Sequence, residues 1–510
     1  MKFVKYIYLI ALISVSLASC YKDKGNYNYH GINEISIKLD GEYAAIYGSR
    51  FTIVPVVSST ADQSQNLLDT SKYKYEWSTI NGGALYADQR RVLSKNPVLD
   101  EVISITPATY TLYLRITDKA TGVMWEQAAK LTVTTQIYEG WLILNDVGGQ
   151  SRLDMLSRSG DNYTFIPSVL DSVDAGLDMS GSPIGVYYSS NAGLLTTANE
   201  QGIYISTSKG TNRVDRENFK WNPQLNIKYQ FYANVPASFV LDGVFGASGE
   251  EWMRSATDNN IYYYYRALNI KYGVPLNIIN AEGSTPFKTS RYFERGGSAI
   301  SGIVFYDDDH KRFVRAPSAQ TSASTMPDDD SYFNYNTGMD LKYMQFTPYG
   351  NGEVFSVLYD KNTNKNYLAR FTFGASIKQT YYAEITGTDF DQAENFAVDP
   401  VFGYLFYNVG GKVYEYDMGL KQSFLMLDKG NHKISLLKFH RFLAAKYTSG
   451  SSGFPVLANK LVVASYDPSA TEGSNGTMEL FNVPQVNGLI TPYQSYTGFG
   501  KIVSLTYRER

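Results

Sequence analysis

The sequence predicts an all-β protein in which an N-terminal β-sandwich of immunoglobulin type precedes a seven-bladed β-propeller. Aromatic residues make up 15% of the 510 residues, and 43 tyrosines outnumber 42 glycines, which favours strands and turns over helices. Alternating apolar segments are separated by turns rich in Gly, Asn and Asp. In the larger, C-terminal part, such strand pairs recur roughly every 53 residues, which is near the spacing of large propeller blades.

The first 20 residues have the pattern of a bacterial lipoprotein signal. Lys2 and Lys5 precede an apolar run from Tyr6 to Leu17, and the segment ends in Leu17-Ala18-Ser19-Cys20. A transmembrane anchor is the alternative, but the apolar run is shorter than the ~20 residues that a span needs. We therefore expect residues 1–19 to be a signal peptide and Cys20 to be the lipidated first residue, which would attach the protein to the outer membrane.

A polar tether and a sandwich domain are predicted next. Residues 20–34 show no apolar period and are expected to link the lipid to the fold. Residues 35–135 are predicted to form the sandwich, in which residues 110–117 and 123–133 alternate as the two strands of a hairpin. Trp77 is expected on a central strand, as sandwiches of immunoglobulin type commonly have.

Residues 138–510 are predicted to form the propeller. Seven strand pairs carry the recurrence, and the last strand, Ile502–Tyr507, is expected to complete a blade and close the ring. The predicted units begin with Trp141–Leu144, Ile184–Tyr188, Val244–Ala247, Gly302–Tyr306, Glu353–Tyr359, Gly403–Val409 and Leu461–Tyr466.

These segments together resemble the PKD-like lipoproteins of Bacteroidetes. The resemblance is carried by Cys20, the following Asp23–Tyr29, Ile32–Ile35 and the Glu139–Leu144 that opens the second part. It implies a PKD-like sandwich and a gene beside a SusC-type TonB-dependent transporter and its SusD-type lipoprotein. It transfers no binding site, because the Trp-Asp-Phe-Gly-Asp-Gly motif of PKD domains proper is replaced by Tyr75–Thr79.

Charge and motifs exclude several function classes. The net charge of −3 argues against a nucleic-acid partner, and one cysteine permits no intramolecular disulfide. The four histidines show no metal-ligand spacing, so no cofactor is expected. Asp307 and Asp309 are weak candidates for Ca²⁺, although a solvated turn is the favoured interpretation. No motif of a catalytic centre is present, and we predict no enzyme activity.

Aromatic residues in loops are the candidate ligand site. Trp221 lies in a Phe-Lys-Trp-Asn-Pro segment, and Tyr332, Phe333 and Tyr335 lie beside Asn334. Aromatic rings pack against the C–H faces of sugars while neighbouring amides bind hydroxyls, although the same side chains can form loop cores.

The predicted function is that of an accessory binding component of a SusC/SusD-type uptake system, which captures an oligosaccharide or a peptide at the extracellular face of the outer membrane. Two alternatives stay open. The protein could be a structural subunit that docks on the transporter without its own ligand, or a propeller enzyme that acts on glycans or peptides.

Overall fold

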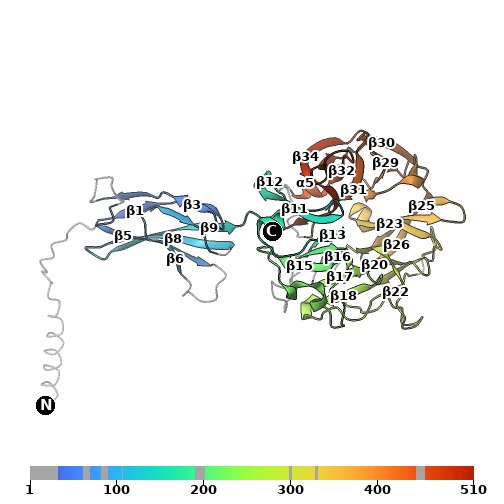
Figure 1. Cartoon of the computed structure of the whole chain (residues 1–510), viewed down its shortest axis with the longest axis horizontal. Coiled ribbons are helices and arrows are strands. Elements are labelled where there is room, and N and C mark those ends of the chain that lie inside the picture. The colour runs from blue at the N-terminus through green and yellow to red at the C-terminus, as the bar shows by residue number, and fades with distance from the viewer. Residues whose placement is uncertain are drawn as a thin grey trace, which may run out of the picture. The chain divides into compact units, whose positions relative to one another are not determined.

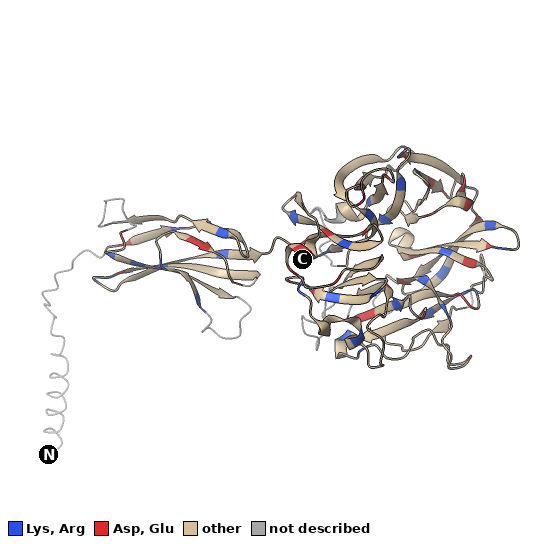
Figure 2. Cartoon of the chain, viewed as in Figure 1, with Lys and Arg blue, Asp and Glu red and all other residues tan. Residues whose placement is uncertain are grey.

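The computed structural model describes residues 33–60, 69–81, 90–105, 107–189, 202–247, 249–297, 301–327, 331–443 and 454–509. The chain divides into two compact units, Met1–Thr135 and Gln136–Arg510. Figure 2 shows Lys and Arg interspersed with Asp and Glu along the strands of each unit, so positively and negatively charged residues are mixed in both. Within the described ranges, no helix is both long and apolar enough to cross a membrane.

The first unit is a β-sandwich. A five-stranded sheet has the order β2-β9-β8-β5-β6, and the strands opposite it form the pairs β1-β4 and β3-β7. The strands are β1 (Ile35–Lys38), β2 (Glu42–Ile46), β3 (Arg50–Ile53), β4 (Val56–Ser59), β5 (Tyr73–Asn81), β6 (Arg91–Ser94), β7 (Leu99–Val102), β8 (Ala108–Asp118) and β9 (Met124–Thr134). Trp77 on β5 is fully buried in the core between these strands, and its Nε1 donates to the carbonyl of Asn96 (3.1 Å).

The second unit is built from antiparallel sheets that follow one another around a ring (Figure 1). Among the described residues there are seven such sheets, which we number as blades 1 to 7. Blades 1 to 3 contain β10 (Gly140–Val147), β11 (Gln150–Ser159), β12 (Asn162–Ile166) and β35 (Lys501–Arg508); β13 (Pro183–Tyr188), β14 (Gly202–Thr207) and β15 (Gly210–Asp215); and β16 (Leu241–Ala247), β17 (Glu250–Ser255) and β18 (Ile261–Tyr265).

Blades 4 to 7 each have four strands. They contain β19 (Thr289–Arg295), β20 (Ile303–Asp307), β21 (Arg312–Ala316) and β22 (Ser324–Thr325); β23 (Asp340–Thr347), β24 (Glu353–Asp360), β25 (Lys365–Phe373) and β26 (Ile377–Glu384); β27 (Phe396–Val398), β28 (Leu405–Val409), β29 (Lys412–Asp417) and β30 (Gln422–Asp428); and β31 (Lys433–Phe439), β32 (Lys460–Tyr466), β33 (Gly476–Asn482) and β34 (Thr491–Phe499). Within the described residues of this unit, the short α-helices are α2 (Val169–Ser172), α3 (Tyr349–Gly352) and α5 (Phe454–Ala458).

The last strand closes the ring. β35 pairs antiparallel with β10, so that Tyr507 lies opposite Trp141 and the two ends of the unit share blade 1. The innermost strands then contact one another in the order β35, β13, β16, β19, β23, β27 and β31, and β31 contacts β35 again. This pairing removes the exposed edge that an open ring would leave. The predicted all-β class, with a sandwich followed by a seven-bladed propeller, is confirmed.

Apolar clusters between neighbouring blades hold the ring together. Between blades 5 and 6, for example, Phe355 and Leu368 pack against Leu405, Tyr407 and Tyr416. Comparable clusters join the other blades in turn, and the cluster between blades 7 and 1 contains residues of β32, β33, β10 and β35. Many of the numerous tyrosines therefore serve packing, because their rings fill these interfaces.

Candidate functional site

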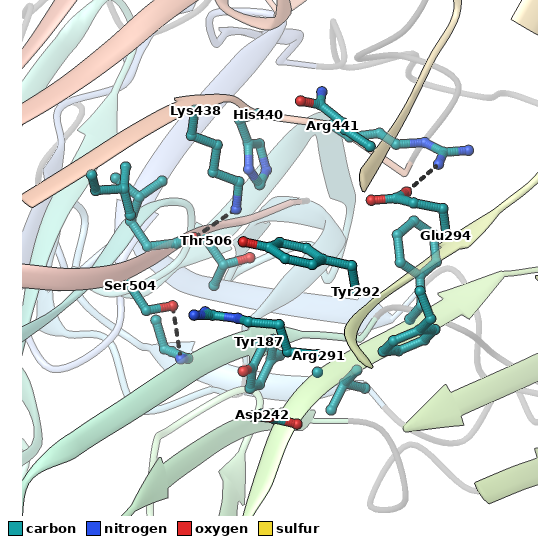
Figure 3. Close-up of a pocket in the computed structure, with 18 of the residues that line it drawn as sticks. Tyr187, Asp242, Arg291, Tyr292, Glu294, Lys438, His440, Arg441, Ser504 and Thr506 are labelled. Atoms are coloured by element: carbon teal, nitrogen blue, oxygen red, sulfur yellow. Dashed lines mark hydrogen bonds and ion pairs between the residues drawn. The ribbon is translucent and has the colours of Figure 1, made fainter. Parts of the chain in front are cut away.

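A cavity of about 700 Å³ lies between the innermost strands of the propeller. Its lining comes from β35, β13, β16, β19, β23, β27 and β31, so each blade contributes to it. An adjoining cavity of about 500 Å³ lies where β23 and β31 end and shares Phe346, His440 and Arg441 with the first. We call the two cavities together the channel, and Figure 3 shows side chains from different strands converging on it.

The innermost strands carry charged and aromatic side chains into this space. β19 provides Arg291, Tyr292 and Glu294, and β31 with the residues that follow it provides Lys438 and Arg441. The middle strands of a blade are covered by neighbouring blades on both faces and must be apolar. An innermost strand beside the channel can instead carry polar groups, because these stay hydrated.

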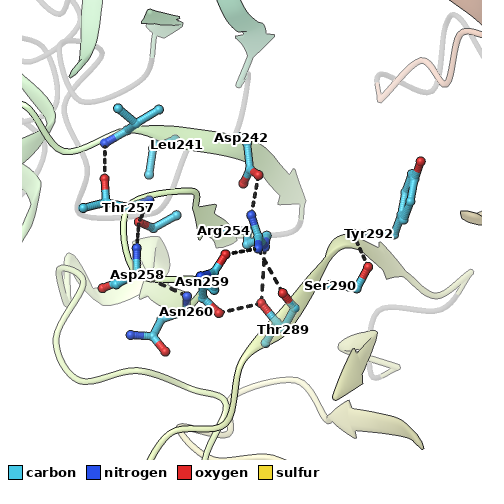
Figure 4. A network of polar contacts seen from close by, with 12 residues as sticks. Leu241, Asp242, Arg254, Thr257, Asp258, Asn259, Asn260, Thr289, Ser290 and Tyr292 are labelled. Carbon is cyan, nitrogen blue, oxygen red and sulfur yellow. Dashed lines mark hydrogen bonds and ion pairs between the residues drawn. The ribbon is translucent and has the colours of Figure 1, made fainter. Parts of the chain in front are cut away.

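One corner of the channel is a closed polar network around Arg254 (Figure 4). The Arg254 guanidinium donates to the Thr289 carbonyl (2.9 Å) and to Asn259 Oδ1 (2.7 Å), and forms an ion pair with Asp242. Burial raises the pKa of the Asp242 carboxyl, while the charges of Arg254 and Arg291 oppose the shift. Arg254 thus neutralises Asp242 from behind the channel wall.

Arg291 lies next to this corner and is not tied into it. In Figure 3 its guanidinium extends toward Ser504, and the ring of Tyr292 has its centroid 5.4 Å from the Arg291 Cζ. No residue in the described ranges forms a hydrogen bond or an ion pair with Arg291. Since a guanidinium stays charged in proteins, Arg291 brings a positive charge without an ion-pair partner among the described residues to the channel.

A second charged corner surrounds Glu294. Arg441 Nη1 lies 3.7 Å from Glu294 Oε2 and donates to the Arg295 carbonyl (3.1 Å), while Lys438 Nζ donates to the Leu505 carbonyl (3.1 Å). Burial raises the pKa of Glu294 to about 7, although Arg441 and Lys438 act against this shift. Burial also lowers the pKa of Lys438 to about 8, and nearby Glu294 opposes that change.

His440 adds no charge to this corner. Its ring packs edge-on against Trp141 (centroids 5.1 Å apart) and Phe442 (4.6 Å), and it is buried. Burial and, to a smaller extent, the charge of Lys438 lower the pKa of His440 well below its ordinary value. The imidazole is therefore neutral near pH 7 and belongs to the apolar wall.

Tyrosine rings form the remaining polar and apolar surface. Tyr187, Tyr292 and Tyr343 line the channel, and the rings of Tyr292 and Tyr343 meet edge to face at 5.3 Å. The Tyr343 hydroxyl donates to Gln345 Oε1, which also accepts from the backbone N–H of Val398 (3.0 Å). Aromatic faces beside fixed charges suit an organic ligand that is apolar on its rings and charged at one end.

The predicted ligand residue Trp221 lies outside the channel. It follows β15 and is half-buried against the cluster between blades 1 and 2. Its Nε1 donates to Asn212 Oδ1 (3.2 Å), and its backbone N–H donates to the Ala175 carbonyl (2.8 Å). The structure gives Trp221 a packing role, and ligand binding at this residue stays a prediction.

The predicted residues Tyr332, Phe333 and Tyr335 lie together between β22 and β23, also away from the channel. Gln379 holds this loop, because its Oε1 accepts from the N–H groups of Tyr332 (2.8 Å) and Phe333 (2.9 Å). Phe333 and Tyr335 are buried in the cluster between blades 4 and 5, whereas Tyr332 is 56% exposed. Only Tyr332 of these three therefore has a large surface to offer a ligand, and binding here also stays a prediction.

The weak Ca²⁺ candidates have other partners. Asp307 is buried, and its Oδ2 accepts from Arg312 Nε (2.9 Å) and contacts His310 Nδ1 (2.8 Å). Asp309 Oδ2 accepts from the Lys288 N–H (2.8 Å). In the part of the chain that the structure describes, no group of three His, Cys, Asp or Glu residues is arranged to hold a metal ion. The lipidation candidate Cys20 lies outside the described residues.

The channel residues were not among the residues predicted from the sequence. Their signal is weak but present in Arg291-Tyr292-Phe293-Glu294-Arg295 and in Lys438-Phe439-His440-Arg441, where charges interrupt strand patterns. Such a strand resembles an ordinary surface strand until the closure of the ring places it inside.

The N-terminal part of the chain matches a known family. Residues 20–183 match the PKD-like family, which covers the sandwich and the beginning of the propeller but less than half of the chain. No curated protein matches the chain.

Solved structures of similar shape are distant. A quinonprotein alcohol dehydrogenase-like protein from Bacteroides thetaiotaomicron is 12% identical, with 92% of this chain and 97% of that chain covered and a TM-score of 0.38. A DUF4784 family protein from Bacteroides caccae is 9% identical over 93% and 98% of the two chains, with a TM-score of 0.30. YCF48 from Cyanidioschyzon merolae is 11% identical over 64% and 96%, with a TM-score of 0.35. At such values these likenesses carry no inference about function.

Proposed function

We propose that this protein is a lipid-anchored binding protein of the outer-membrane surface that captures an oligosaccharide or a peptide in the propeller channel and passes it to a SusC/SusD-type transporter. The match to the PKD-like family begins at residue 20, where the lipoprotein pattern places the acylated cysteine. The sandwich would then stand between the anchor and the propeller in the chain. The binding is non-covalent and needs no cofactor.

The channel is the observation that carries this proposal. Its volume of about 700 Å³ suits a ligand of a few sugar rings or amino acids, and ligand pockets of this kind combine aromatic walls with few convergent polar groups. Tyr187, Tyr292 and Tyr343 supply the walls, while Arg291 and Lys438 supply polar groups. Charged groups with incomplete pairing inside a cavity are a known mark of functional sites.

Binding is tested with the full-length protein in detergent. Calorimetry with panels of acidic and neutral oligosaccharides and of short peptides is expected to give saturable binding to at least one member. Tyr292→Ala removes a channel wall and is expected to weaken this binding more than about tenfold. The matched control is Tyr232→Ala, because Tyr232 is 68% exposed and does not line the channel. Equal affinity in both variants would reject the channel as the site.

The anchor and the partner are tested in native membranes. Cys20→Ser is expected to move the protein from the membrane fraction to the soluble fraction, because the acyl chains supply the attachment. Affinity purification of the native protein is expected to recover the transporter, and protease added to intact cells is expected to digest the propeller. Recovery of the transporter by a protein that binds no ligand would favour the alternative of a purely structural subunit.

A propeller enzyme is the second candidate, and two carboxyls in one cavity favour it. Asp242 and Glu294 both line the channel, and the pKa of Glu294, raised by burial to about 7, would suit a general acid at neutral pH. Release of product from a glycan, with its loss in Glu294→Gln, would establish this activity. Binding without turnover in the same assay supports the non-catalytic proposal.

A further inference from the structure

The charges of the channel are unevenly paired. Of its carboxyls, Asp242 is paired with Arg254, Glu294 lies 3.7 Å from Arg441, and Glu509 accepts from the N–H of Leu443 (2.7 Å). Two cations remain, because neither Arg291 nor Lys438 has a carboxylate within ion-pair distance among the described residues. A ligand carboxylate could therefore approach Arg291 without displacing an ion pair of the protein.

Arg291 is the better placed of the two cations. Lys438 is half-buried and donates to the Leu505 carbonyl, whereas Arg291 is exposed, lines the channel and donates no hydrogen bond from its side chain to the described residues. Arg254 forms the ion pair with Asp242, so Arg291 acts on this carboxyl only through the longer-range attraction of its charge. The free guanidinium has the planar pair of donors that binds a carboxylate at two points.

The groups around Arg291 suit a ligand in which a ring carries a carboxylate. The Tyr292 ring lies over the guanidinium, and the Ser504 hydroxyl, which accepts from the Val186 N–H (3.2 Å), faces it across the channel (Figure 3). If a ligand carboxylate pairs with Arg291, the rest of the ligand would lie against Tyr187 and Tyr292. Its hydroxyls or amides could there form hydrogen bonds with the Ser504 hydroxyl.

We infer that the channel selects ligands with a carboxylate, which pairs with the guanidinium of Arg291. This inference rests on the proposed function and narrows its ligand class. A uronic acid and the C-terminus of a peptide share this chemistry. Arg291 is a binding residue in this arrangement, and Lys438 adds a longer-range attraction for the same charge.

Matched ligands test the inference with the full-length protein. Digalacturonic acid is compared with its dimethyl ester, and trialanine with trialanine amide, by calorimetry at low salt. The acid of at least one pair is expected to bind roughly 10- to 100-fold more tightly than its neutral partner, as loss of a charged hydrogen-bonded pair implies. The pair that shows the difference identifies the source of the carboxylate.

Variants connect the difference to Arg291. Arg291→Gln is expected to lower the affinity for the acid to about that for its neutral partner. Lys378→Gln is the control, because Lys378 is exposed on β26 and its loss changes the net charge equally. Equal affinity of the native protein for the acid and its neutral partner, or a preference for the acid that Arg291→Gln keeps, overturns this inference and leaves the proposed function standing. Failure of the acids and neutral partners alike to bind overturns both.

Discussion

Two glutamates of the propeller, the buried Glu251 and the half-buried Glu294, have opposite surroundings. Glu251 on β17 lies between blades 2 and 3 and accepts from Arg266 Nη2 (2.7 Å), Ser189 Oγ (2.6 Å) and the hydroxyls of Tyr204 (2.9 Å) and Tyr272. Although burial opposes its ionisation, Arg266 and these donors outweigh burial and hold the pKa of Glu251 below its ordinary value. Burial raises the pKa of Glu294 beside the channel to about 7, because Arg441 at 3.7 Å, the backbone of Phe346 and the charge of Lys438 offset burial only in part.

The comparison distinguishes charged groups whose hydrogen bonds stabilise the fold from charged groups beside the channel whose hydrogen bonding is incomplete. The desolvation cost of a buried carboxylate is compensated when each of its lone pairs accepts a hydrogen bond. Glu294 and Lys438 have fewer partners, and Arg291 has no hydrogen bond or ion pair in the described residues. In the proposed binding site, a ligand would supply the partner that Arg291 lacks.

The largest effect is expected from Glu251→Gln. This change leaves the Arg266 cation, which is fully buried, without its counter-charge, and breaking such a pair costs on the order of 3–5 kcal/mol. Urea unfolding of the propeller measures the loss. Glu384→Gln is the control, because the pair of Glu384 with Lys365 is exposed and contributes less than about 1 kcal/mol. A similar small loss in both variants would contradict the structural role of Glu251.

Glu415 is a buried carboxyl without hydrogen-bond partners in the described residues, and it does not line the channel. This glutamate on β29 is buried, and both of its carboxyl oxygens lack a hydrogen-bond partner in the described residues. Burial, with Asp399 and Asp417 nearby, raises its pKa from 4.5 to about 8. Between these two pH values the folded protein holds a proton that the unfolded chain has released, so stability falls as pH rises through this interval.

Glu415→Gln removes this titration. At pH 8 to 9 the variant is expected to be more stable than the native protein by on the order of 3 kcal/mol, and its stability should vary less between pH 5 and 8. Thermal unfolding at several pH values gives the comparison. An unchanged pH profile would mean that Glu415 has a partner in solution that neutralises it, such as a bound cation.

The strands inside the blades were predictable, and the reason is their burial on both faces. Segments such as Leu461–Tyr466 and Glu353–Tyr359 are nearly continuous apolar runs, because each faces a neighbouring blade on either side. In blades 4 to 7 the predicted units begin with the second strands β20, β24, β28 and β32, and the innermost strands β19, β23, β27 and β31 were not identified. In blades 2 and 3 the predicted units begin with the innermost strands β13 and β16.

The channel was not predictable from the same pattern. Arg291 and Glu294 on β19 and Lys438 on β31 are far apart in sequence, and only ring closure by β35 places them around one space. The exposed position of Tyr332 cannot be distinguished in sequence from the buried position of Phe333 beside it. Sequence alone therefore does not tell which loop aromatics have a surface to offer a ligand.

Arg291→Gln is expected to change the stability of the propeller much less than Glu251→Gln does. Because Arg291 has no hydrogen bond or ion pair within the described residues, its removal breaks only the contact with the Tyr292 ring and a longer-range attraction to Asp242. The expected change in the free energy of unfolding is less than about 1 kcal/mol, in contrast with the loss in Glu251→Gln. A loss comparable to that of Glu251→Gln would make Arg291 a structural residue.

The smallest effect on stability is expected from Tyr332→Ala, which separates the loop site from the channel site. Tyr332 is 56% exposed and its backbone, rather than its ring, meets Gln379, so truncation should change stability by no more than about 0.5 kcal/mol. Phe333→Ala, one residue away, removes a buried ring and is expected to cost about 3 kcal/mol or more. If the ligand binds in the channel, Tyr332→Ala keeps the native affinity while Arg291→Gln loses the preference for acids. The reverse result would place recognition on the loop aromatics and leave the channel charges without a ligand.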